Sequence, residues 1–94
     1  MQNPSQVFKA LSNKNRLAIF DYLRQHDLNV AELDNGPNVG EVAEQFNLAL
    51  STISHHLRVL HEAGLIVCEQ RGQNTFCTIN HDMLDEICAF FSEA

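Results

Sequence analysis

One predicted helix, near residues 50–63, carries the side chains best suited to bind another molecule. Its apolar residues Ile53, Leu57 and Leu60 fall at i, i+4 and i+7, so they form one stripe that has to face a core. A second face, at i, i+3, i+4, i+7 and i+11, is polar and consists of Ser51, Ser54, His55, Arg58 and Glu62. Such hydroxyl, imidazole and guanidinium groups donate hydrogen bonds to base edges and phosphates when the start of a helix enters a DNA major groove. A solvated polar face is the plainer interpretation of an isolated helix, so the neighbouring segments decide between the two.

The elements predicted around this helix favour contact with DNA. Three helices precede it, and a β-hairpin and a last helix follow; in chain order the predicted ranges are 4–11, 13–26, 39–46, 50–63, 65–79 for the hairpin and 82–92. Asn47 and Gly64 suit tight helix exits, and Arg71-Gly72-Gln73-Asn74 suits a hairpin turn. A short helix, a turn, an amphipathic helix and a basic-tipped hairpin form a helix-turn-helix with a wing. The sequence therefore predicts a mainly α, winged helix-turn-helix domain over residues 1–94.

The segment 27–38 between the second and third helices contains Asn-Gly-Pro, which breaks regular structure. It is predicted to be a loop in which Val30, Ala31 and Leu33 pack locally. No function is assigned to it.

The charge distribution bears on the DNA interpretation. The chain of 94 residues has a net charge of −6, which opposes binding to phosphates. Residues 51–72, however, hold two arginines, two glutamates and three histidines, so the predicted reading face is neutral or cationic while the acid lies elsewhere. No segment has the composition of a secretion signal or a membrane span, so a cytoplasmic protein without a membrane partner is expected.

These motifs together resemble the ArsR/SmtB family of winged-helix repressors over nearly the full chain. The residues that carry the resemblance are Val7-Phe8-Lys9-Ala10-Leu11-Ser12, Arg16-Leu17, Val39-Gly40-Glu41-Val42-Ala43, Ser51-Thr52-Ile53-Ser54-His55-His56-Leu57-Arg58-Val59-Leu60, Glu62-Ala63-Gly64-Leu65-Ile66 and Arg71-Gly72. The resemblance implies a homodimer built from the first and last helices, about 4–11 and 82–92. It also implies a repressor that occupies operator DNA until an inducer of unknown identity favours a low-affinity state.

The DNA-contacting residues are predicted on this basis. They are Ser51, Thr52, Ser54, His55 and Arg58 from the recognition helix, Arg71 and Gln73 from the wing, and Lys14 and Arg16 from the second helix. The chain also departs from the family pattern, since Ala49-Leu50 stands where Ser-Gln is common and Gln73 where a second arginine is common. An Ala at the helix cap costs about 1 kcal/mol relative to Ser. Leu50 cannot hydrogen-bond a base, although it can touch a thymine methyl group.

Two metal sites recur among members of this family, and neither set of ligands is complete here. The start of the third helix has no Cys-x-Cys group. The last helix offers one histidine with carboxylates: His81, Asp82, Asp85, Glu86 and Glu93. Because zinc prefers nitrogen or sulfur ligands in tetrahedral number, we predict neither a metal nor a cofactor, and His81 is expected to mark a helix start.

The cysteines raise a separate hypothesis. If the hairpin turn is centred between Gly72 and Gln73, Cys68 and Cys77 lie directly opposite each other, at a distance close to disulfide reach. A thiol switch in the wing is one interpretation of this pair; the other is that Cys77 packs as a small apolar residue and Cys68 has no role. Cys88 is expected to lie in the core near the dimerising helix.

Two other classes of protein are alternatives to a DNA reader. An enzyme is not predicted, because Ser54, His55 and His56 are consecutive helix residues that point in different directions and no acid is placed to orient an imidazole. A winged helix that binds only protein is the alternative function, and the acidic net charge fits it. Salt-dependent binding to DNA separates that alternative from a DNA reader.

Overall fold

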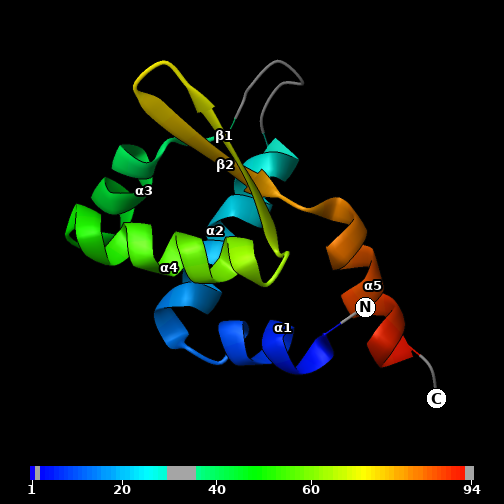
Figure 1. Ribbon diagram of the computed structural model, residues 1–94. Coiled ribbons are helices and arrows are strands. Elements are labelled where there is room, and N and C mark those ends of the chain that lie inside the picture. Colours follow the sequence, from blue (N-terminus) through cyan, green and yellow to red (C-terminus); the bar gives the residue numbers. More distant parts are fainter. Residues whose placement is uncertain (2, 30–35, 93–94) are drawn as a thin grey trace.

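The computed structural model describes residues 1, 3–29 and 36–92. In chain order the elements are α1 (Pro4–Leu11), α2 (Lys14–Asn29), α3 (Val39–Phe46), α4 (Leu50–Glu62), β1 (Ile66–Arg71), β2 (Asn74–Ile79) and α5 (His81–Ser92). Figure 1 shows the β1–β2 hairpin alongside α4, with its turn near α3, and α5 at the other end of the molecule beside the start of α1. The predicted fold class and order of elements are confirmed. Within the described residues, no helix combines the length and apolarity needed to cross a membrane.

Several predicted boundaries need correction. The second helix continues past His26 to Asn29, so the start of the predicted 27–38 loop is helical. The local packing expected of Val30, Ala31 and Leu33 lies outside the described residues. The hairpin lies within the predicted range 65–79, and its ladder continues through polar residues to Arg71 and Asn74 on either side of the turn. The last helix begins one residue early, at His81.

The core lies where α4 crosses α1, α2 and the hairpin. Ile53 and Leu60 of α4 are fully buried with Ile19 and Leu23 of α2, and Leu65 precedes β1 in the same cluster. The apolar stripe predicted for α4 is therefore confirmed. Burying a side chain of this size contributes about 1.5–3 kcal/mol relative to leaving it exposed. This burial fixes the rotation of α4 about its axis, and with it the face that points to solvent.

His56 is a buried polar residue on the core side of α4, and it is not among the residues predicted to have a function. It follows Ile53 by three residues and precedes Leu60 by four, so the helical spacing already places it beside the apolar stripe. Arg16 of α2 donates through Nε to the Ala10 carbonyl oxygen at 2.8 Å, and its Nη1 lies 3.4 Å from His56 Nδ1. Because a guanidinium only donates, Nδ1 has to be the unprotonated nitrogen for this contact to form. The pair thus joins α1, α2 and α4 around a neutral imidazole.

The core role of α4 gives a first prediction. Leu60→Ala should lower the free energy of unfolding by about 2–5 kcal/mol, because it leaves a cavity in a fully buried site. Leu50→Ala, on the same helix but 60% exposed, is the matched control and should change the free energy by less than about 0.5 kcal/mol. Urea unfolding at one fixed protein concentration measures both. Equal losses for the two variants would contradict the packing described.

A second prediction concerns acid stability. Burial lowers the pKa of His56 below its usual 6.5, and the nearby Arg16 and His55 lower it further. Because the folded protein then binds this proton more weakly than the unfolded chain, the stabilising contribution is present above pH 6.5 and is lost as the pH falls through the lowered pKa. The free energy of unfolding, measured at about pH 7.5 and at about pH 5, should decrease less between the two pH values in His56→Gln than in the wild type. The glutamine side chain accepts a hydrogen bond from Arg16 but does not titrate. The same slope in both proteins would rule out His56 as the source.

Candidate nucleic-acid interface

The turn between α3 and α4 sets the angle of the two helices. At the start of α3, Asn38 accepts from the Glu41 backbone N–H at 2.8 Å and the Glu41 carboxylate accepts from the Asn38 backbone N–H at 3.0 Å, a reciprocal capping box. At its end Asn47 adopts the left-handed conformation with φ 52°, as predicted. The Leu48 backbone N–H then donates to the Ala43 carbonyl at 3.2 Å, which closes the turn.

The first turn of α4 has no side-chain cap. Ala49 is the N-cap residue, in an extended conformation with φ −61° and ψ 148°, and it makes no capping hydrogen bond. The expectation that Ala49 occupies the cap position is therefore confirmed. The first backbone N–H groups of α4 are therefore left to other acceptors, and they lie at the positive end of the helix dipole.

The solvent face of α4 carries the residues predicted to contact DNA. Ser51, Thr52, Ser54, His55 and Arg58 are all exposed, as are His61 and Glu62 in the last turn of the helix. The structure thus brings the five predicted residues together on one helix, opposite the buried stripe. Leu50 extends the same surface with an apolar side chain.

The wing carries the next predicted contacts. Gly72 has φ +62°, a conformation that glycine adopts readily, in the turn between Arg71 and Asn74. Arg71 donates through Nε to Glu69 Oε1 at 3.0 Å, and both side chains are exposed. Such an exposed ion pair is worth at most about 1 kcal/mol, so Arg71 can leave it for a phosphate at little cost. Gln73 is exposed in the turn beside it.

The two residues predicted from α2 lie in different surroundings. Arg16 is half-buried and holds Ala10 and His56 in place, so much of its donor capacity is used inside the protein. It also lines a surface hollow with His55, which keeps it near the exposed face of α4. Lys14 is exposed at the start of α2, where it lines a different surface hollow with Leu17 and Arg24.

Cys68 and Cys77 occupy opposite positions of the hairpin, as predicted. Their sulfur atoms are 3.7 Å apart. Cys77 is fully buried and Cys68 partly exposed. The expectation for Cys88 is wrong: it is exposed, because α5 contacts the protomer over only part of its surface.

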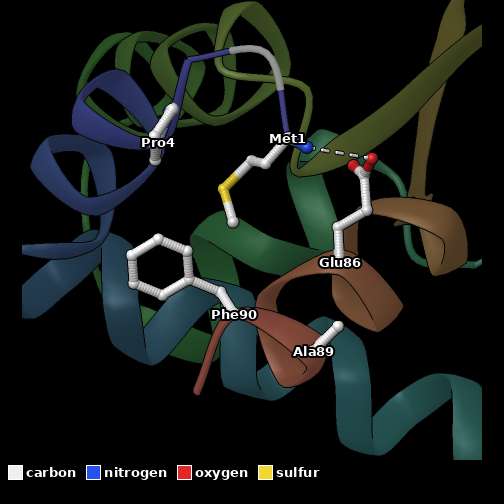
Figure 2. A pocket seen from close by; sticks show the side chains of 5 residues that line it. All are labelled: Met1, Pro4, Glu86, Ala89 and Phe90. Atoms are coloured by element: carbon white, nitrogen blue, oxygen red, sulfur yellow. Dashed lines mark ion pairs between the residues drawn. The ribbon is translucent and has the colours of Figure 1, made fainter. Parts of the chain in front are cut away.

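Helix α5 contains no buried residue, although it is rich in apolar side chains. Phe8 of α1 packs against Phe90 and Phe91 with ring centroids 5.3 and 5.5 Å apart, yet these two residues of α5 remain 51% and 71% exposed. Figure 2 shows Phe90 next to Met1 and Pro4 in a hollow between the start of α1 and α5. The face formed by α1 and α5 therefore leaves apolar surface uncovered in one protomer.

His81 lies at the start of α5, as expected. Its Nε2 is 2.6 Å from Asp27 Oδ2, an ion pair when the imidazole is protonated, and this contact joins α5 to the end of α2. Over residues 1, 3–29 and 36–92, no three His, Cys, Asp or Glu side chains gather closely enough to hold a metal ion.

Comparisons with known proteins agree with this geometry. Residues 11–69 match a family described as a helix-turn-helix domain. The transcriptional repressor SdpR of Bacillus subtilis is 33% identical over 82 residues, which span 87% of this chain and 81% of that protein. The arsenical resistance operon repressor of Staphylococcus aureus is 30% identical, over 88% of this chain and 71% of its own length.

A solved structure shows the same fold. The homodimeric winged helix-turn-helix DNA-binding domain Mb0332 of Mycobacterium bovis, a possible ArsR-family regulator, superposes with a TM-score of 0.72 and 25% identity over 99% of this chain and 83% of that one. With a helix-turn-helix match over more than half of its length, and repressors among its relatives, the chain belongs to the ArsR family of winged helix-turn-helix transcriptional regulators.

Proposed function

We propose that this protein is a homodimeric repressor that inserts α4 of each protomer into the major groove of operator DNA. The observation that carries the proposal is the exposed polar face of α4, Ser51 to Arg58, which the buried stripe and the α3–α4 turn hold in a fixed orientation. A helix of 13 residues with short polar groups at its start fits the major groove, where base edges are most distinct. Operator DNA as partner implies that the protein acts in the cytoplasm.

Each predicted contact has a chemical role in this arrangement. Ser51 and Thr52 lie in the first turn of α4, where hydroxyls and free backbone N–H groups bind phosphate. Ser54 and His55 follow on the side that faces base edges. Arg58 supplies a guanidinium, the group that most often pairs with guanine or phosphate.

The wing and α2 supply the flanking contacts. Arg71 and Gln73 extend the surface to the neighbouring DNA backbone. Arg16 and Lys14 add positive charge on the other side of α4. Since the whole chain carries a net charge of −6, we expect weak binding to unrelated DNA and a marked loss of affinity with salt.

The α1–α5 face supports the homodimer. Phe8, Phe90 and Phe91 form an aromatic group that one protomer leaves half covered, and a second copy would cover it. Two-fold symmetry then places two copies of α4 on one side of the dimer, one helical turn of DNA apart.

Binding to a duplex taken from upstream of the protein's own gene tests the proposal. Arg58→Ala should lower the affinity by about 1–3 kcal/mol and make its salt dependence shallower. Arg24→Ala is the matched control, because Arg24 is already paired with Asp21 on α2, and it should bind like the wild type. Fluorescence anisotropy over a range of salt concentrations measures both quantities. Binding without a salt dependence, or equal losses for the two variants, would move the assignment to a winged helix that binds protein.

A further inference from the structure

The cysteine pair of the wing is arranged for direct reaction between its two sulfurs. Cys68 and Cys77 are register partners, and the Cys77 backbone N–H donates to the Pro37 carbonyl at 3.0 Å instead of to β1. The two residues thus form a non-hydrogen-bonded pair of the ladder, the kind in which side chains approach most closely. A disulfide has a sulfur separation of about 2.05 Å, which small side-chain rotations reach from the observed 3.7 Å.

The two sulfurs differ in access. Cys68 lies on the wall of a surface cavity of about 230 Å³ between the hairpin and α4, lined also by Ser54, Arg58 and His61. Cys77 reaches the same cavity from the core, where its residue surface is fully buried. A small oxidant can therefore reach Cys68 first, while the Cys77 sulfur stays in contact with it at 3.7 Å.

The pKa values of the two thiols also differ in the sense that makes Cys68 the reactive one. The two sulfurs lie within hydrogen-bond distance, and either could be the donor. This contact with Cys77 lowers the pKa of Cys68 to about 7; burial opposes the shift and the nearby His61 adds to it. The same hydrogen bond and burial raise the pKa of Cys77. A thiol whose pKa is near the ambient pH is the most effective nucleophile, because it combines a large thiolate fraction with retained reactivity.

We propose that Cys68 and Cys77 form a dithiol that hydroperoxides oxidise to a reversible cross-strand disulfide, and that this modification weakens binding to operator DNA. The Cys68 thiolate attacks one peroxide oxygen and breaks the O–O bond, which yields a Cys68 sulfenic acid and, for hydrogen peroxide, a hydroxide that takes a proton to become water. The Cys77 sulfur then attacks the Cys68 sulfur, loses its proton and displaces a second water. Two thiols and one hydrogen peroxide thus give one disulfide and two waters.

The link to DNA follows from the shared cavity and rests on the function proposed above. Ser54 and Arg58, both predicted DNA contacts, line the same cavity as the two cysteines. Drawing the sulfurs together shifts Cys68 relative to these two residues and tightens the hairpin next to α4. The wing and recognition helix then no longer hold the relative position that the reduced protein presents to DNA.

The first experiment counts thiols, with Cys88→Ser as the background so that the exposed third cysteine cannot react. After treatment with hydrogen peroxide, this variant should lose both thiols and two hydrogens of mass, and dithiothreitol should restore them. Adding Cys77→Ser should stop the reaction at a Cys68 sulfenic acid that dimedone traps, while Cys68→Ser should prevent it. If both thiols persist under peroxide that oxidises Cys88 in the wild type, or if Cys68 gains oxygen without forming a disulfide, the dithiol assignment is wrong.

The second experiment measures binding of the Cys88→Ser protein to the upstream duplex before and after oxidation. Affinity should fall about fivefold or more on oxidation, return with dithiothreitol, and stay unchanged when Cys68→Ser is added. A disulfide that forms without changing affinity would overturn the regulatory half of the proposal. If the reduced protein does not bind DNA, that half falls together with the proposed function, while the thiol count still decides the chemistry.

Discussion

Burial of the apolar stripe of α4 is the constraint on which the rest of the molecule depends. Ile53, Leu57 and Leu60 fix this helix against α1, α2 and the hairpin, and so decide which residues of α4 face solvent. The same burial holds His56 next to Arg16. Through its contacts with Ala10 and His56, Arg16 of α2 joins α1 and α2 to α4. A change in the rotation of α4 would have to expose apolar surface and bury Arg58, and both are costly.

The wing depends on the same core through β2. Cys77 and Ile79 of β2 are buried on the core side of the hairpin, and the Pro37 carbonyl and Asn38 pair with the outer edge of β2. The hairpin, the start of α3 and α4 therefore form one connected unit. This connection places a reactive dithiol next to the surface that we assign to DNA, so a change in the oxidation state of the cysteines can alter the adjacent DNA contacts.

The sequence predicts the elements well where a local signal controls them. Asn47, Gly64 and Gly72 each stand where the chain needs a left-handed conformation, and the period of the α4 stripe identifies its buried face. The opposition of Cys68 and Cys77 followed from the centre of the hairpin turn alone. The end of α2 was missed because tertiary packing, and not a local stop signal, sets how far a helix continues.

The candidate site was predicted in part. Exposed positions on α4 follow from the helical period, but the inward role of Arg16 depends on Ala10 and His56, which only the folded chain brings together. His56 lies at core spacing, but histidine is a polar residue type that the helical period alone does not assign to the core, so its burial is clear only in the folded chain. The exposure of Cys88 also depends on tertiary packing. Helix α5 packs against the rest of its own protomer over too small an area to bury any of its residues, and the sequence does not show this.

The central claim is that the exposed face of α4, with the wing beside it, binds DNA. Titration of the isotopically labelled protein with the upstream duplex, followed by backbone amide chemical shifts, tests it most directly. The account predicts the largest shifts in residues 50–58 and 71–73, with small changes in the α1–α5 face. Shifts confined to α1 and α5, or none under any salt condition, would contradict it.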